Sequence, residues 1–142
     1  MWSCSPAVPE VGNVARKRRV LVVDDEKIIR MLFRRILRED EVELECAGSG
    51  SEASEKLQAA PYDIVFLDVM MPEIGGIEML KELHKKGVRV PPVVMMTGYT
   101  AEGQVKEAFQ YGAIGCIFKP FNIKEVLDIL KVAFENGQGE QK

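Results

Sequence analysis

The sequence of 142 residues lacks long apolar runs: no stretch approaches the roughly 18–20 residues that a membrane span needs. Near its first residue there is also no apolar core of the roughly 7–15 residues typical of a secretory signal. Cysteine is scarce, and the odd number and wide spacing of Cys4, Cys46 and Cys116 fit neither a disulfide framework nor a zinc site. These absences predict a cytoplasmic protein, without a membrane partner, whose thiols are reduced and incidental to function.

Glycine and proline are too few for a fibrous chain, and aliphatic residues are too many for a disordered one. The length fits one domain of ordinary size. The formal net charge of −3 is unevenly divided, because residues 1–19 carry +3 and residues 20–142 carry −6. The acidic balance of the larger part argues against direct binding to nucleic acid phosphates.

Residues 1–18 are interpreted as a flexible tail, because Ser, Pro, Gly and Asn interrupt them and no apolar period is sustained. From residue 19 onward, short apolar runs alternate with helical patterns. Polar residues and glycines mark the helix ends, with N-caps at Ser49, Thr100 and Asn122 and stops at Gly87 and Gly112. The predicted strands are 20–23, 42–47, 64–67, 93–96 and 114–118.

Several of these strands are apolar on both faces, which is typical of a parallel sheet covered by helices on both sides. Five strand–helix units are too few for an eight-fold barrel. We therefore expect an α/β fold with a doubly wound, five-stranded parallel sheet. The domain is predicted to span 19–135, followed by a polar C-terminal tail at 136–142 where a linker to an output domain would begin.

Polar residues collect where the predicted strands end. Asp24 and Asp25 follow the first strand, Asp68 the third, Thr97 the fourth and Lys119 the fifth. In an open parallel sheet, ligands bind at the carboxyl ends of the strands, so these side chains are expected in one pocket. Three carboxylates repel one another unless a hard cation such as Mg²⁺ neutralises them. With a lysine and a hydroxyl added, the set suits phosphoryl transfer, and a carboxylate can be the nucleophile.

The sequence also carries four motifs in order, each at an expected strand end. They are Val22-Val23-Asp24-Asp25-Glu26, Asp68-Val69-Met70-Met71-Pro72 with Gly76 four residues later, Met96-Thr97-Gly98 and Lys119-Pro120-Phe121. On these motifs the chain resembles the receiver domain of bacterial two-component response regulators, in the chemotaxis-regulator-like superfamily, from about residue 19 to residue 134. The resemblance implies a flavodoxin-like fold with strand order 2-1-3-4-5.

It also implies roles for the acidic residues. Asp68 would accept a phosphoryl group from the phosphohistidine of a sensor histidine kinase or a histidine phosphotransfer protein. Asp25, Asp68 and the backbone carbonyl of Met70 would bind Mg²⁺ directly, and Asp24 would act on the metal through water. The protein would then be a signalling phosphoacceptor rather than an enzyme, catalysing only its own phosphorylation and dephosphorylation.

The resemblance further implies a switch region. Lys119 would contact the phosphoryl oxygens, the Lys119–Pro120 bond would be cis, and Thr97 would move inward to the phosphoryl group. Receivers often carry Tyr or Phe three residues before this lysine, where the present chain has Cys116, so the usual aromatic switch is absent here. A separate hypothesis is that the bulky Met70 and Tyr99 hinder the attacking water and lengthen the phosphorylated lifetime.

Other interpretations were weighed against this one. The segment Gly48-Ser49-Gly50-Ser51-Glu52-Ala53 resembles a dinucleotide fingerprint but follows the wrong strand, and a turn with a capping box explains it better. A flavin site would need a hydroxyl-rich loop in place of the acidic one, and an aspartyl phosphatase would need an acid in place of Met70. The remaining alternative is a receiver-like interaction module that works without phosphorylation. The 142 residues hold no predicted output domain, so the output would be a downstream protein or a missing domain.

Overall fold

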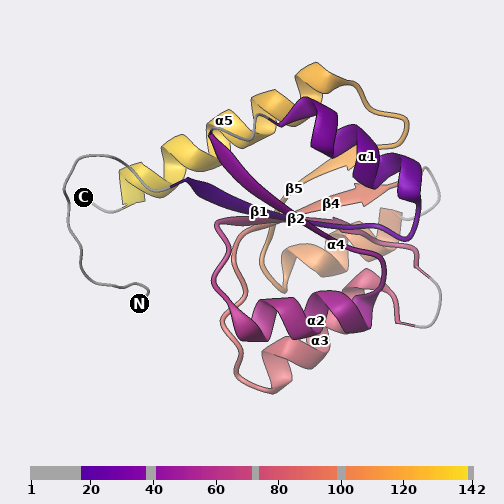
Figure 1. Ribbon diagram of the computed structural model, residues 1–142. Helices are drawn as coiled ribbons and strands as arrows, with labels where there is room; N and C mark the ends of the chain where they lie inside the picture. The colour runs from indigo at the N-terminus through magenta and orange to yellow at the C-terminus, as the bar shows by residue number, and fades with distance from the viewer. Residues whose placement is uncertain (1–16, 38–40, 72–73, 99–101, 141–142) are drawn as a thin grey trace.

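Five strands form one sheet between two layers of helices in the computed structural model of the chain (Figure 1). The structure describes residues 17–37, 41–71, 74–98 and 102–140. Strands and helices alternate strictly along the chain. The elements are β1 (Arg18–Val23), α1 (Lys27–Ile36), β2 (Val42–Ala47), α2 (Gly50–Ala59), β3 (Ile64–Asp68), α3 (Gly76–Lys85), β4 (Val93–Thr97), α4 (Glu102–Phe109), β5 (Ala113–Phe118) and α5 (Ile123–Glu140).

The strand order is β2-β1-β3-β4-β5, and every neighbouring pair is parallel. The predicted doubly wound α/β fold with order 2-1-3-4-5 is confirmed. From β1 the chain crosses to β2 on one side of β1, and it then crosses back to β3 on the other side. Where the order of the strands reverses in this way, the loops after β1 and β3 lead to opposite faces of the sheet. A crevice forms between them at the carboxyl ends of the two strands, where such sheets bind ligands.

The core is divided by the sheet into two apolar clusters, because successive side chains of a strand point to opposite faces. Figure 1 shows α1 and α5 over one face and α2, α3 and α4 over the other. Strands β3 and β4 are buried along their whole length, as their uninterrupted apolar sequences predict. The buried strand residues of the α2–α3–α4 side include Leu21, Val23, Val65, Leu67, Val93 and Met95, and those of the α1–α5 side include Val20, Val22, Ile64, Phe66, Val94, Met96 and Ile117.

Two of the predicted helix caps form as expected. Oγ of Ser49 accepts a hydrogen bond from the backbone N–H of Glu52 at 3.1 Å, although the Glu52 carboxylate returns to the N–H of Gly48 rather than to that of Ser49. Asn122 and Glu125 form a reciprocal capping box with two 2.9 Å bonds. The cap predicted at Thr100 lies outside the described residues.

The elements extend beyond the predicted boundaries at both ends. Strand β1 begins at Arg18, a residue that was predicted to belong to the tail. The guanidinium of Arg18 lies 4.8 Å from the ring centre of Phe134 in α5. Helix α5 runs to Glu140 and so includes most of the segment 136–142 that was predicted to be a tail. Residues 1–16 of the N-terminal tail, with Cys4, lie outside the described residues.

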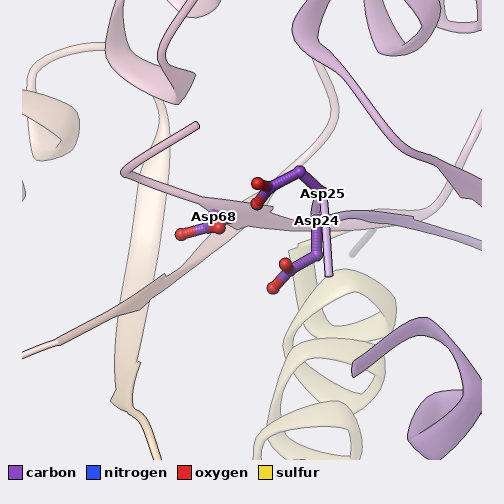
Figure 2. A group of neighbouring side chains, drawn as sticks. All are labelled: Asp24, Asp25 and Asp68. Atoms are coloured by element: carbon purple, nitrogen blue, oxygen red, sulfur yellow. The ribbon is translucent and has the colours of Figure 1, made fainter. Parts of the chain in front are cut away.

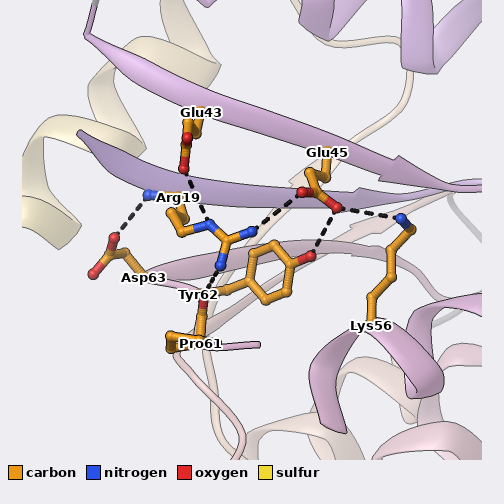
Figure 3. Close-up of polar contacts among 7 residues, drawn as sticks. All are labelled: Arg19, Glu43, Glu45, Lys56, Pro61, Tyr62 and Asp63. Atoms are coloured by element: carbon orange, nitrogen blue, oxygen red, sulfur yellow. Dashed lines mark hydrogen bonds and ion pairs between the residues drawn. The ribbon is translucent and has the colours of Figure 1, made fainter. Parts of the chain in front are cut away.

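Arg19 joins the edge strand β2 to the loop before β3 (Figure 3). Its guanidinium contacts Glu43 at 3.2 Å and Glu45 at 3.1 Å, donates to the carbonyl of Pro61 at 3.0 Å and lies over the ring of Tyr62. The Tyr62 hydroxyl donates to Glu45 at 3.0 Å. Burial and this bond to a carboxylate raise the pKa of Tyr62 to about 12. The basic residue at the start of the domain therefore has a structural role.

Candidate functional site

Three aspartates meet at the carboxyl ends of β1 and β3 (Figure 2). Each of Asp24, Asp25 and Asp68 offers a carboxylate oxygen, and these oxygens lie within 4.8 Å of one another. Asp24 and Asp68 are almost fully buried, whereas Asp25 is exposed. The structure thus brings together the three acids that the sequence placed at the ends of two separate strands.

Asp24 is held through both its backbone and its side chain. Its N–H donates to the carbonyl of Ala47 at 3.1 Å, and Oδ1 accepts from the N–H of Glu26 at 2.9 Å. The other carboxylate oxygen, Oδ2, is buried and accepts no hydrogen bond of good geometry, although Nζ of Lys119 lies 2.8 Å away. A buried carboxylate oxygen of this kind has capacity for one more electropositive neighbour.

Lys119 reaches from the end of β5 into the acidic cluster. Its Nζ lies 2.8 Å from Asp24, 3.4 Å from Asp68 and 3.5 Å from Glu26. Burial alone would lower the pKa of Lys119, but the close contact with Asp24 and the charges of Asp24, Asp68 and Glu26 outweigh burial and raise it. The lysine therefore remains a cation throughout the physiological pH range.

Opposing influences act on the pKa of the Asp68 carboxyl group. Burial, together with the charge of Asp24, raises its pKa from 3.8 to about 6, against the lowering effects of Lys119 and of the Met70 N–H. That N–H donates to Oδ1 of Asp68 at 3.1 Å, which leaves Oδ2 facing Lys119. The carboxylate is therefore oriented by the backbone on one side and by a cation on the other.

Gly76 allows helix α3 to begin directly against the end of β3. A Cβ at this position would overlap the carbonyl oxygen of Asp68 and would come within 3.0 Å of Cγ of Leu67. The N–H of Gly76 donates to the carbonyl of Val69 at 3.2 Å, which closes the loop. The glycine that follows the second motif thus allows a close backbone approach next to the acidic cluster.

The predicted switch residues lie in β4, in β5 and just after β5. Thr97 is buried at the end of β4, where its hydroxyl donates to the carbonyl of Gly98 at 3.0 Å. Its carbonyl accepts from the N–H of Lys119 at 2.8 Å, which ties β4 to β5 at the site. The Lys119–Pro120 bond is cis, as expected. Cys116 is half-buried on the α2–α3–α4 side, and burial raises the pKa of its thiol.

The sequence predicts core positions for Met70, Met71, Met79, Met95 and Met96, and Met70 departs from this prediction. Its side chain is 59% exposed beside Asp68, whereas Met79, Met95 and Met96 are buried as predicted. Met70 lies two residues after the end of β3, in the turn where its N–H bonds to Asp68, and its side chain is exposed there. Tyr99, the other residue expected to flank the phosphoryl group, lies outside the described residues.

Two residues near the acids were missed by sequence reasoning. Glu26 contacts Lys119 and donates its N–H to Asp24, and Nη1 of Arg30 donates to the carbonyl of Asp24 at 2.7 Å. Glu26 is the last residue of the first motif, but its position in the sequence suggested no role for it. Arg30 stands one helical turn beyond Glu26, and that spacing is the signal that could have drawn attention to it.

The donor set fits a small hard cation. Carboxylate oxygens are the ligands that Mg²⁺ prefers, and Asp24, Asp25 and Asp68 offer three of them at one point. The buried Oδ2 of Asp24 has the Lys119 ammonium 2.8 Å away but accepts no hydrogen bond of good geometry, so it has capacity for a further cation. Burial and the charge of Asp24 raise the pKa of Asp68, and a divalent ion would offset the second of these influences.

The sheet order and the acidic cluster together define a doubly wound, flavodoxin-like domain with its site at the topological switch point. Comparison with known proteins gives the family. Residues 20–131 match the response regulator receiver domain, and the chain belongs to this family of two-component signalling proteins.

Individual relatives agree with this assignment. The chain is 35% identical over 123 residues to the transcriptional regulatory protein PdtaR of Mycobacterium tuberculosis, covering 86% of this chain and 59% of that protein. It is 37% identical over 109 residues to the transcriptional regulatory protein ResD of Bacillus subtilis, covering 77% of this chain and 45% of that protein. The chain thus spans about half the length of these curated relatives.

Solved structures show the same fold. The chemotaxis protein CheY4 of Vibrio cholerae is 33% identical, with a TM-score of 0.74 and coverage of 83% of this chain and 99% of that one. A CheY-like receiver domain protein of Methanospirillum hungatei is 27% identical, with a TM-score of 0.79 and coverage of 88% and 99%. In the part of the chain that the structure describes, no helix is long and apolar enough to cross a membrane.

Proposed function

We propose that this receiver domain is a phosphorylation-controlled switch whose acceptor is Asp68. The observation that carries the proposal is the setting of the Asp68 carboxylate, which is buried beside two further carboxylates and 3.4 Å from the ammonium of Lys119. The donor would be the phosphohistidine of a sensor histidine kinase or of a histidine phosphotransfer protein, in keeping with the family.

In the proposed reaction, an oxygen of ionised Asp68 attacks phosphorus as the bond from phosphorus to the donor's imidazole nitrogen breaks. The imidazole leaves and takes up a proton, and an aspartyl phosphate remains. Water later attacks the same phosphorus and releases inorganic phosphate, which restores the carboxylate. A pKa of about 6 keeps Asp68 mostly ionised near neutral pH, so the nucleophile is available without a separate base.

The other residues of the site would neutralise and report the new charge. Mg²⁺, held by Asp24, Asp25, Asp68 and the backbone carbonyl of Met70, would stabilise the charge on the phosphoryl oxygens. Lys119 is already within 3.4 Å of Asp68 and would pair with one of those oxygens. Thr97 would exchange its bond to Gly98 for a bond to another, and the surface around α4 and β5 would change with it.

The consequence of the switch would be altered binding to a protein partner or to an output domain. PdtaR and ResD are transcriptional regulatory proteins of about twice the matched length, so an output domain following α5 is one form the partner could take. The domain itself would carry out only its own phosphorylation and dephosphorylation, and we place it in cytoplasmic signalling without direct contact to nucleic acid.

The direct test is labelling of the protein by acetyl phosphate in the presence of Mg²⁺, read by intact mass as one added phosphoryl group. We expect labelling of the parent, loss of labelling in Asp68→Asn, and loss on chelation of Mg²⁺. Asp128→Asn, which removes an exposed carboxylate of α5, is the matched control and should label as the parent does. An unlabelled parent would favour an interaction module that works without phosphorylation.

A further inference from the structure

Arg30 of α1 lies between the two loops that border the acidic cluster. Its Nη1 donates a 2.7 Å hydrogen bond to the backbone carbonyl of Asp24, in the loop after β1. On the other side the guanidinium lies against Gly48, in the loop after β2, where an added Cβ would come within 3.4 Å of Nη1. The side chain is half-buried in this position, unlike the neighbouring Arg34 and Arg35, which are exposed.

With the hydrogen bond from Arg30, the N–H, a carboxylate oxygen and the carbonyl of Asp24 are all held by neighbouring residues. The N–H of this residue is fixed to Ala47, Oδ1 is fixed by the N–H of Glu26, and the carbonyl is fixed by Arg30. Together they determine the direction of the peptide that leads from Asp24 to Asp25. Because Asp25 is exposed at the surface of the cluster, its position depends on that peptide.

We infer that Arg30 is a positioning residue, which holds the Asp24–Asp25 turn in the geometry that binds Mg²⁺. The inference rests on the proposed function of this site as a magnesium-dependent phosphoacceptor. Arg30 would touch neither the metal nor the phosphoryl group, and it would act through the carbonyl of Asp24. Groups that orient metal ligands in this way typically change metal affinity by about 10-fold or more when they are removed.

The sign of the effect distinguishes positioning from simple charge. A cation next to three carboxylates repels a divalent ion, so removing the charge of Arg30 would by itself tighten Mg²⁺ binding. Loss of the hydrogen bond to Asp24 would loosen the turn and weaken binding. The inference predicts weaker binding in Arg30→Met, which is the opposite of the electrostatic expectation.

The experiment is a calorimetric titration of the metal-free protein with MgCl₂, which reads affinity without any phosphorylation. We expect the Mg²⁺ dissociation constant to rise roughly 10-fold in Arg30→Met. Arg30→Lys, which keeps a donor and the charge, should stay within about 3-fold of the parent. Arg35→Met removes an exposed arginine from the same helix and should leave the constant unchanged.

Gly48→Val tests the same contact from the other loop. Its side chain would displace the guanidinium while leaving Arg30 in place, so it should weaken Mg²⁺ binding in the same direction. If circular dichroism shows that Arg30→Met does not fold, the other two variants decide between the outcomes. Weaker Mg²⁺ binding in Gly48→Val, together with nearly parental Mg²⁺ binding in Arg30→Lys, supports the positioning role. Mg²⁺ affinity equal to or tighter than that of the parent, in Arg30→Met or in Gly48→Val, overturns the inference.

Labelling by acetyl phosphate separates this inference from the proposed function. In Arg30→Met the Mg²⁺ concentration for half-maximal labelling should rise, while the rate at saturating Mg²⁺ stays within about 3-fold of the parent. If the parent binds Mg²⁺ but is never labelled, the proposed function is wrong and the positioning role of Arg30 still holds. If the parent is labelled but Arg30→Met binds Mg²⁺ with unchanged affinity, the proposed function holds and the positioning role is wrong.

Discussion

The ammonium of Lys119 lies 2.8 Å from Oδ2 of Asp24, closer than to Oδ2 of Asp68, which is 3.4 Å away. In this state the lysine is therefore paired mainly with a proposed metal-binding residue and only partly with the proposed acceptor. A phosphoryl group on Asp68 would offer new anionic oxygens to the same ammonium. Phosphorylation of Asp68 would thus draw Lys119 from Asp24 toward the acceptor.

Removing the lysine should raise the pKa of Asp68 above about 6. Lys119 is the principal group that lowers this pKa against burial and the charge of Asp24, so Lys119→Met leaves the raising influences unopposed. Carbon-13 NMR titration of the aspartate carboxyl groups, without Mg²⁺, measures the shift. Lys124→Met, which removes an exposed lysine paired with Asp128, is the control. A parental midpoint for Asp68 in Lys119→Met would contradict the prediction.

Asp68→Asn should stabilise the metal-free fold above pH 6. The folded-state pKa of Asp68 is raised from 3.8 to about 6, so its favourable contribution is present below pH 3.8 and is lost as the pH rises through about 6. At pH 7.5 in EDTA, the amide variant avoids that loss, and we expect it to be about 1–3 kcal/mol more stable than the parent. Urea unfolding followed by circular dichroism gives the difference.

Adding Mg²⁺ to the urea unfolding experiment provides an internal control. Added Mg²⁺ should stabilise the parent more than Asp68→Asn, because ligand binding to the native state raises stability by mass action and the variant lacks one carboxylate ligand. Asp128→Asn, at an exposed ion pair of α5, should differ from the parent by under about 0.5 kcal/mol. An Asp68→Asn protein no more stable than the parent in EDTA would show that the pKa of Asp68 is not raised.

Gly76→Ala should destabilise the fold by about 1–3 kcal/mol and slow labelling of Asp68. The added methyl group would overlap the carbonyl oxygen of Asp68, so either α3 or the end of β3 must shift. Gly103→Ala is a matched control in α4: an added Cβ there has open space, and a helical alanine should be neutral or slightly stabilising. Urea unfolding and acetyl phosphate labelling report the two effects, and equal stability of the two variants would contradict this account.

The order of the sheet and the meeting of the acids could be predicted because both follow from pattern. Uninterrupted apolar runs such as Ile64–Leu67 indicate a doubly covered parallel sheet, and that topology places Asp24 and Asp68 at one edge. Element ends were less predictable. Arg18 was assigned to the tail because no apolar period is sustained up to it, yet it extends β1 and packs on Phe134, a residue more than a hundred positions away.

Contacts that depend on tertiary geometry could not be predicted. A half-buried arginine such as Arg30 and an exposed one such as Arg35 look alike in a helical pattern, because the pattern does not show which loops approach the helix. The exposure of Met70 was mispredicted for the same reason: its hydrophobicity suggests the core, but the turn after β3 directs it outward. Roles that depend on dynamics, such as the movement of Thr97, remain predictions.

Met70→Ser should shorten the lifetime of the aspartyl phosphate. The Met70 side chain is 59% exposed, and its own N–H is bonded to Asp68, so we expect a bulky apolar group next to the path by which water reaches the phosphorus. A small polar side chain opens that path and can orient the water, which should raise the hydrolysis rate severalfold. The decay of labelled protein after removal of acetyl phosphate measures the rate. Met31→Ser, at an exposed methionine of α1, is the control, and a decay rate in Met70→Ser equal to that of Met31→Ser would rule out shielding by Met70.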